Sequence, residues 1–131
     1  MVSDLDIFIN KSIFWKKRVT IDLTQLKTEE NIKQVAAVMR DTEDMDEVRE
    51  HAGATLGRIG TDNAINILEH DLNTCTDYKT RLFCLVGLRV STHPRTNKIL
   101  LERLADENED GRIRQAACYN LATRHCDDVI P

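Results

Sequence analysis

Hydrophobic positions recur along this chain at intervals of 32 or 33 residues. Sliding the sequence against itself by that distance brings six columns into register. Four columns draw on four successive segments: Leu23, Leu56, Leu88 and Leu121; Val19, Ala52, Cys84 and Ala117; Trp15, Val48, Thr80 and Ile113; and the basic Lys16, Arg49, Arg81 and Arg114. Two columns hold three residues each: Val35, Leu68 and Leu100, and Met39, Leu72 and Leu104. A fixed period of this length is the sequence signature of a repeat protein.

Each repeat predicts two α-helices. One stripe of the first helix in the clearest repeat consists of Val48, Ala52, Leu56 and Ile59, at i, i+4, i+8 and i+11. Gly57 and Gly60 bracket the predicted end of that helix, where glycine tolerates a left-handed C-cap. Thr61 and Asp62 are N-cap candidates for the second helix, and Pro94 suits the first turn of the corresponding helix one repeat later.

The wording from Val48-Arg49 through Ala52 to Leu56-Gly57 and Ile59-Gly60 resembles the HEAT-like repeats first recognised in phycobilin lyases. The resemblance is best in residues 44–73, extends over 77–105 and 110–124, and is weakest in 12–40. It implies an all-α solenoid of stacked antiparallel helical hairpins, about 3.5 of them, with the second helices on the concave side. It specifies architecture more closely than activity.

The predicted organisation is a single domain, 1–131. Residues 1–11 form an N-terminal cap, 12–40, 44–73 and 77–105 are repeats, and 110–131 is an incomplete final repeat. The segment Val19–Leu23 alternates like a strand, but its register predicts a helix. Register also predicts that the last first helix spans about Arg112 to Arg124 and that a second helix barely begins at Cys126. We expect the open side of that helix, near Ala116 and Tyr119, to form a two-fold homodimer contact, which sedimentation at several concentrations tests.

Composition narrows the class of protein. With 41% hydrophobic and 31% charged residues the chain suits a helical protein with a real core. Its formal net charge of −4 disfavours nucleic acid as a partner. No secretory signal and no apolar run long enough for a membrane span is present, so a cytoplasmic protein without a membrane partner is expected. The four cysteines have irregular spacings, which favours free thiols over disulfides or zinc.

Candidate catalytic and metal-binding residues are few. Glu50-His51 follows Arg49 in a setting similar to the His-Glu pairs of deoxyhypusine hydroxylase, a HEAT-type di-iron enzyme. Here the order is inverted, and the equivalent pairs Leu82-Phe83 and Gln115-Ala116 cannot ligate iron. Other His and Cys positions that invite a zinc hypothesis fit no known zinc spacing: His70, Cys75, His125 and Cys126. We therefore expect no catalytic residue, no metal and no cofactor, and favour a protein that is not an enzyme.

The arginine column has a structural interpretation. An arginine at this place in each hairpin reaches the acidic start of the neighbouring repeat, so that the pairs form a ladder along the stack. The expected acidic partners are Asp46, Asp77 and Asp110. This ladder is preferred to a phosphate-binding stripe because its charge would be neutralised within the chain.

The candidate binding surface lies along the second helices. Register places Lys33, Asn66 and Lys98 in one exposed column and Ala37, His70 and Glu102 in the next, with Glu69 and Arg103 flanking them. The mixture of signs suits a specific protein-binding surface. We therefore expect a module (an adaptor, regulator or immunity-type inhibitor) that binds another protein or a peptide there. Two alternatives stay open: a lyase-like subunit that handles a prosthetic group, and a nucleic-acid-binding protein resembling the HEAT-like alkylpurine glycosylases.

Overall fold

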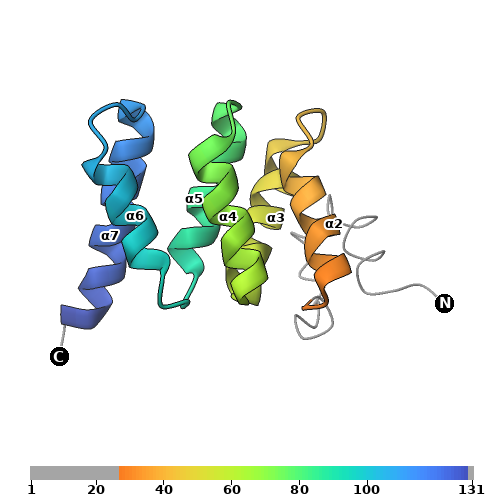
Figure 1. Ribbon diagram of the computed structural model, residues 1–131, viewed down its shortest axis with the longest axis horizontal. Helices are drawn as coiled ribbons and strands as arrows, with labels where there is room; N and C mark the ends of the chain where they lie inside the picture. Colours follow the sequence, from red (N-terminus) through yellow and green to blue (C-terminus); the bar gives the residue numbers. More distant parts are fainter. Residues whose placement is uncertain (1–26, 130–131) are drawn as a thin grey trace.

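The computed structural model describes residues 27–129, with side chains through Arg124, and this part of the chain is all α-helical. Its helices are α2 (Glu29–Arg40), α3 (Asp46–Ile59), α4 (Asp62–Thr74), α5 (Tyr78–Val90), α6 (Thr96–Ala105) and α7 (Gly111–Val129). Figure 1 shows them standing side by side, with α2, α4 and α6 in front of α3, α5 and α7. The predicted N-terminal cap, 1–11, and the strand-like Val19–Leu23 lie outside the described residues.

Packing follows two rules. The first helices pack along one row, α3 on α5 and α5 on α7, and each second helix packs on the first helix that follows it in the chain. Accordingly α4 contacts α5 more extensively than it contacts α3. Each second helix therefore joins neighbouring repeats rather than closing off its own.

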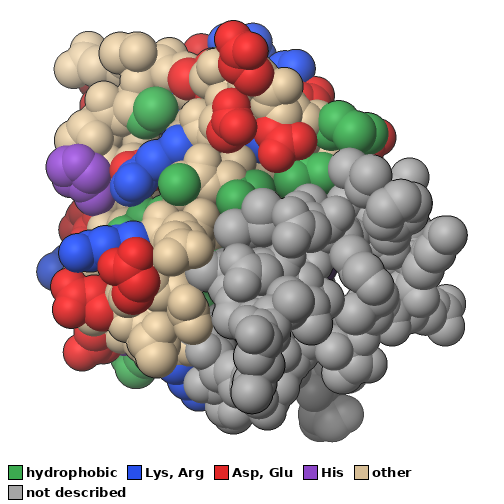
Figure 2. Space-filling model, turned by 90° about the vertical axis from the view of Figure 1, so that its right-hand side faces the viewer, with side chains coloured by type: hydrophobic (Ala, Val, Ile, Leu, Met, Phe, Trp, Pro, Cys, Tyr) green, Lys and Arg blue, Asp and Glu red, His purple; other side chains and the backbone are tan. Residues whose placement is uncertain are grey.

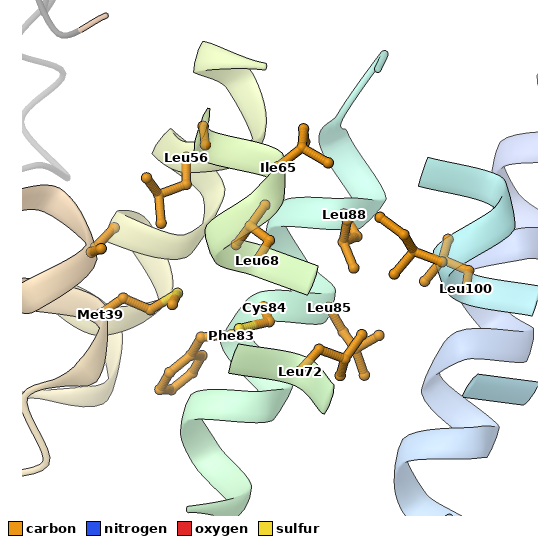
Figure 3. Packing of buried hydrophobic residues seen from close by; sticks show 14 of the residues in the cluster. Met39, Leu56, Ile65, Leu68, Leu72, Phe83, Cys84, Leu85, Leu88 and Leu100 are labelled. Atoms are coloured by element: carbon orange, nitrogen blue, oxygen red, sulfur yellow. The ribbon is translucent and has the colours of Figure 1, made fainter. Parts of the chain in front are cut away.

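The predicted columns form the core. In each of three columns every described member is buried: Leu56, Leu88 and Leu121; Ala52, Cys84 and Ala117; Val35, Leu68 and Leu100. Figure 3 shows Leu56, Leu68 and Leu88 with their neighbours, Met39 and Leu72 among them, along one continuous apolar layer. Burial of these side chains, at about 25 cal/mol per Å² of apolar surface, is the main force that holds the helices together.

Helix ends match the expected chemistry at three places. The Thr61 hydroxyl accepts a hydrogen bond from the backbone N–H of Ala64, 3.3 Å away, and so caps α4 as predicted. Asp77 caps α5 in the same way through Thr80. Gly60 ends α3 in the left-handed conformation, with φ of 65°, as predicted for a C-cap.

The predicted role of Gly57 at the helix end is wrong. Gly57 is helical and buried, and it lies where the α3 and α5 backbones cross. A Cβ atom on Gly57 would lie 2.6 Å from the carbonyl carbon of Gly87, closer than real Cβ atoms come to other atoms. Gly53 and Gly87 are equally closed to a side chain. Glycine is required here for close approach of two helices rather than for a turn.

Two predicted helix boundaries shift. Pro94 lies in the turn before α6 rather than in its first turn, and the helix begins at Thr96. At the other end α7 continues to Val129, so the second helix predicted to begin at Cys126 is absent from the described residues. The position equivalent to the C-cap Gly60 is His125, and without glycine the chain has no left-handed stop there.

Candidate partner-binding surface

The exposed side of α2, α4 and α6 carries most of the residues predicted for binding, and we call it the second-helix face. It is defined by Lys33, Asn66, His70, Lys98 and Glu102, all of them exposed. Each helix contributes to it: α2 through Lys33, α4 through Asn66 and His70, and α6 through Lys98 and Glu102. The end of the molecule in Figure 2 likewise has acidic and basic side chains interspersed on its described surface. The face therefore offers charges of both signs.

Lys33 and Asn66 lie together in a groove between α2 and α4. The groove has a volume of about 210 Å³ and is also lined by Glu29, Ile32, Asn63 and Ile67. Lys33 is held loosely by Glu29, one turn earlier, at 3.7 Å. Because an exposed ion pair of this kind contributes well under about 1 kcal/mol, Lys33 is readily released to a partner's carboxylate.

Arg95, which sequence reasoning missed, joins Asn66 to Glu69. Its guanidinium donates to Asn66 Oδ1 at 2.5 Å and to Glu69 Oε1 at 3.2 Å, and so ties α4 to the start of α6. The imidazole of His93 holds the turn behind it, accepting from the Arg95 N–H at 3.1 Å and contacting Asp62 at 2.7 Å. The register did contain the signal, because Arg95 occupies the column of Asn63, one turn before Lys98.

Arg103 lies apart from the other predicted residues. Its guanidinium is partly buried and pairs with Glu109 at 2.8 Å and with Asp106 at 3.4 Å. Glu109 also receives the Arg81 guanidinium at 2.6 Å, and only 4% of its side chain is exposed. Burial opposes ionisation of this carboxyl, but the hydrogen bonds from Arg81 and Arg103 outweigh it and hold the Glu109 pKa at about 2. Arg103 therefore belongs to a structural network between α5, α6 and α7.

Replacing Glu109 with glutamine is expected to lower the free energy of unfolding at pH 7 by about 3 kcal/mol, because two arginines lose their shared anion. The normal carboxyl has a folded pKa of about 2 against 4.5 for the model value, so its contribution is complete above pH 4.5 and is lost as pH falls toward 2. Urea unfolding at pH 7, 4 and 3 should therefore show the two proteins converging with acid. Glu107→Gln, an exposed position on the same loop, is the control, and a constant difference at every pH would contradict this assignment.

The arginine column forms the predicted ladder, with one partner changed. Arg49 pairs with Asp77 at 3.1 Å, which confirms that prediction. Arg81 pairs with Glu109 rather than with Asp110, which instead holds Arg112 at 2.9 Å. The remaining rung, Lys16 with Asp46, lies partly outside the described residues, and Asp46 pairs with Lys79 at 2.9 Å.

A second function of the arginines was not predicted. The Nε–H groups of Arg49, Arg81 and Arg114 donate to the backbone carbonyls of Met39, Leu72 and Leu104, at 3.0, 2.8 and 3.0 Å. All three carbonyls lie in the last turn of a second helix, where helix geometry provides no partner. The repeated arginine thus closes the end of the preceding helix, and this geometry recurs with the period of the sequence.

The Glu50-His51 pair lies on α3, away from the second-helix face. Burial, together with the charge of Arg58, lowers the His51 pKa. Within the described residues no group of three or more His, Cys, Asp or Glu side chains is arranged to hold a metal ion. No helix in that part of the chain has the length and apolar content to cross a bilayer.

The chain matches no protein-family model, no curated protein and no solved structure.

Proposed function

We propose that this protein is a binding module of the α-solenoid class, built from HEAT-like hairpins, and that it binds another protein or a peptide on its second-helix face. The observation that supports this most is the placement of one sequence column. Lys33 and Asn66 line a single groove, and Lys98 occupies the equivalent exposed position on α6. A row of equivalent positions on parallel helices suits recognition of an extended partner.

The chemistry of the face indicates the kind of partner. Lys33 and Lys98 are exposed cations that flank Asn66, while Glu102 and His70 provide an acceptor and a titratable group beside them. A partner that presents carboxylates to the lysines and a donor to Glu102 would match this pattern. Because such pairs lie at the surface, we expect them to govern specificity and association rate more than total affinity. The proposed location is the cytoplasm, and the homodimer through α7 stays a prediction.

Reversing both lysines, Lys33→Glu with Lys98→Glu, is expected to reduce partner binding at least tenfold while the helix content stays unchanged. The reason is that both charges repel the carboxylates they were placed to attract. Affinity capture followed by titration of the captured partner measures the loss. Lys79→Glu, on α5 beside Asp46, is the matched control and should leave binding unchanged. Equal binding by all three proteins would place the functional surface elsewhere.

A further inference from the structure

The outward side of α5 is apolar where a solvent-facing helix is usually polar. Leu82, Val86 and Val90 follow one another at i, i+4 and i+8, which places them on one stripe of the helix. All three are partly exposed, and none belongs to the hydrophobic core formed by the described residues. They lie in the row of first helices, separate from the second-helix face. This stripe is therefore apolar surface that the fold itself does not use.

A groove runs between this stripe and α3. It has a volume of about 260 Å³, and its apolar floor is Ala54, Val86 and Val90. Ligand pockets for cofactors usually begin at about 300 Å³ and enclose most of the ligand. A groove of this size suits a few side chains of a peptide that lies along it.

Charge is separated along the groove. Glu47 and Glu50 line the end near the start of α3, and Arg58 and Arg89 line the opposite end. All four side chains are exposed, and none forms an ion pair within the described part of the chain. Charges of opposite sign, held one helix length apart on either side of an apolar floor, are complementary to a dipolar segment.

We propose that this groove docks a single amphipathic helix of a partner protein, with acidic residues in its first turn and basic residues in its last turn. That charge order is the one that stabilises an isolated helix, because it complements the helix dipole. The acidic turn would meet Arg58 and Arg89, and the basic turn would meet Glu47 and Glu50. The docked helix therefore runs antiparallel to α3, with its apolar stripe on Val86 and Val90. This surface is additional to the second-helix face and does not depend on it.

The test uses two synthetic peptides of about 15 residues, a length at which helices become marginally stable in water. Both carry a leucine stripe at helical spacing. The forward peptide has three glutamates in its first turn and three lysines in its last, and the reversed peptide has these turns exchanged. Fluorescence anisotropy measures the affinity of each for the full chain, for Val86→Asp, and for the charge-exchanged variant Glu50→Lys with Arg89→Glu.

We expect the full chain to prefer the forward peptide at least tenfold and Val86→Asp to bind it at least tenfold more weakly. The charge-exchanged variant should shift the ratio of the two affinities toward the reversed peptide. That ratio is independent of the peptides' own helicity, because the same two peptides are compared on both proteins. The variant Lys33→Glu with Lys98→Glu should bind the forward peptide normally, which keeps this test separate from that of the second-helix face.

Three results would overturn the proposal. One is a ratio of affinities unaltered by the charge exchange, and another is forward-peptide binding unaffected by Val86→Asp. The third is a dimer of the chain alone, in sedimentation, that Val86→Asp abolishes, because it would assign the groove to a second copy. Circular dichroism of each variant should be unchanged, since every substituted side chain is at least partly exposed.

Discussion

Replacing Gly57 with alanine is expected to lower the free energy of unfolding by about 3 kcal/mol, the upper part of the usual cost of overpacking a core. The added methyl group would lie 2.8 Å from Cα of Gly87 and closer still to its carbonyl group. These are backbone atoms, which cannot rotate away, so α3 and α5 must separate along their length. Separation would also loosen the contacts of Leu56 and Leu88, which both helices bury. Urea unfolding measures the change.

Gly111→Ala is the matched control. Gly111 is the first residue of α7, and a Cβ atom there would meet no other atom within 4 Å. Alanine is the better helix former by about 1 kcal/mol, so this variant should be unchanged or slightly more stable. If Gly57→Ala loses less than about 1 kcal/mol, the two helices do not approach as closely as the structure describes.

Truncating Leu56 to alanine is expected to cost about 2–5 kcal/mol, the range for leucines removed from a packed core. Leu56 is fully buried and occupies the centre of the leucine column, with Leu88 equivalent to it on α5. Leu101→Ala, at a position 53% exposed on α6, provides the comparison and should cost far less. A loss below about 1 kcal/mol for Leu56→Ala would contradict the register.

Much of the helical core could be predicted because the repeat supplied several independent readings of each position. One leucine at Leu56 indicates little, but Leu88 and Leu121 at the same register position indicate a shared environment. The same redundancy predicted the arginine ladder. It did not distinguish Glu109 from Asp110 as the partner of Arg81, because adjacent residues on a loop differ in reach only once the backbone is placed.

Features that depend on pairs of helices were not predictable in the same way. Gly57 looked like part of a helix end because glycine is common there, and its true constraint is the backbone of Gly87, 30 residues later. The length of α7 depended on whether the chain would turn without a glycine near His125. Register alone contained no information about how these elements meet.

The candidate surface was predicted as a set of columns, and the columns are a statement about direction rather than about contacts. Lys33, Asn66 and Lys98 are exposed as expected, since exposure follows from helix periodicity. Which side chains are engaged by their neighbours is decided by geometry between helices. Arg103 faces Glu109, and Arg95, absent from the predicted set, holds Asn66 and Glu69.

Lysine footprinting of the captured complex tests most directly whether a partner binds the second-helix face. Acetylation rates of single lysines are measured by mass spectrometry with and without the partner, and Lys79 serves as an internal standard on the row of first helices. The account predicts that the partner slows acetylation of Lys33 and Lys98 at least severalfold and leaves Lys79 unchanged. Unaltered rates at Lys33 and Lys98 in a stable complex would contradict it.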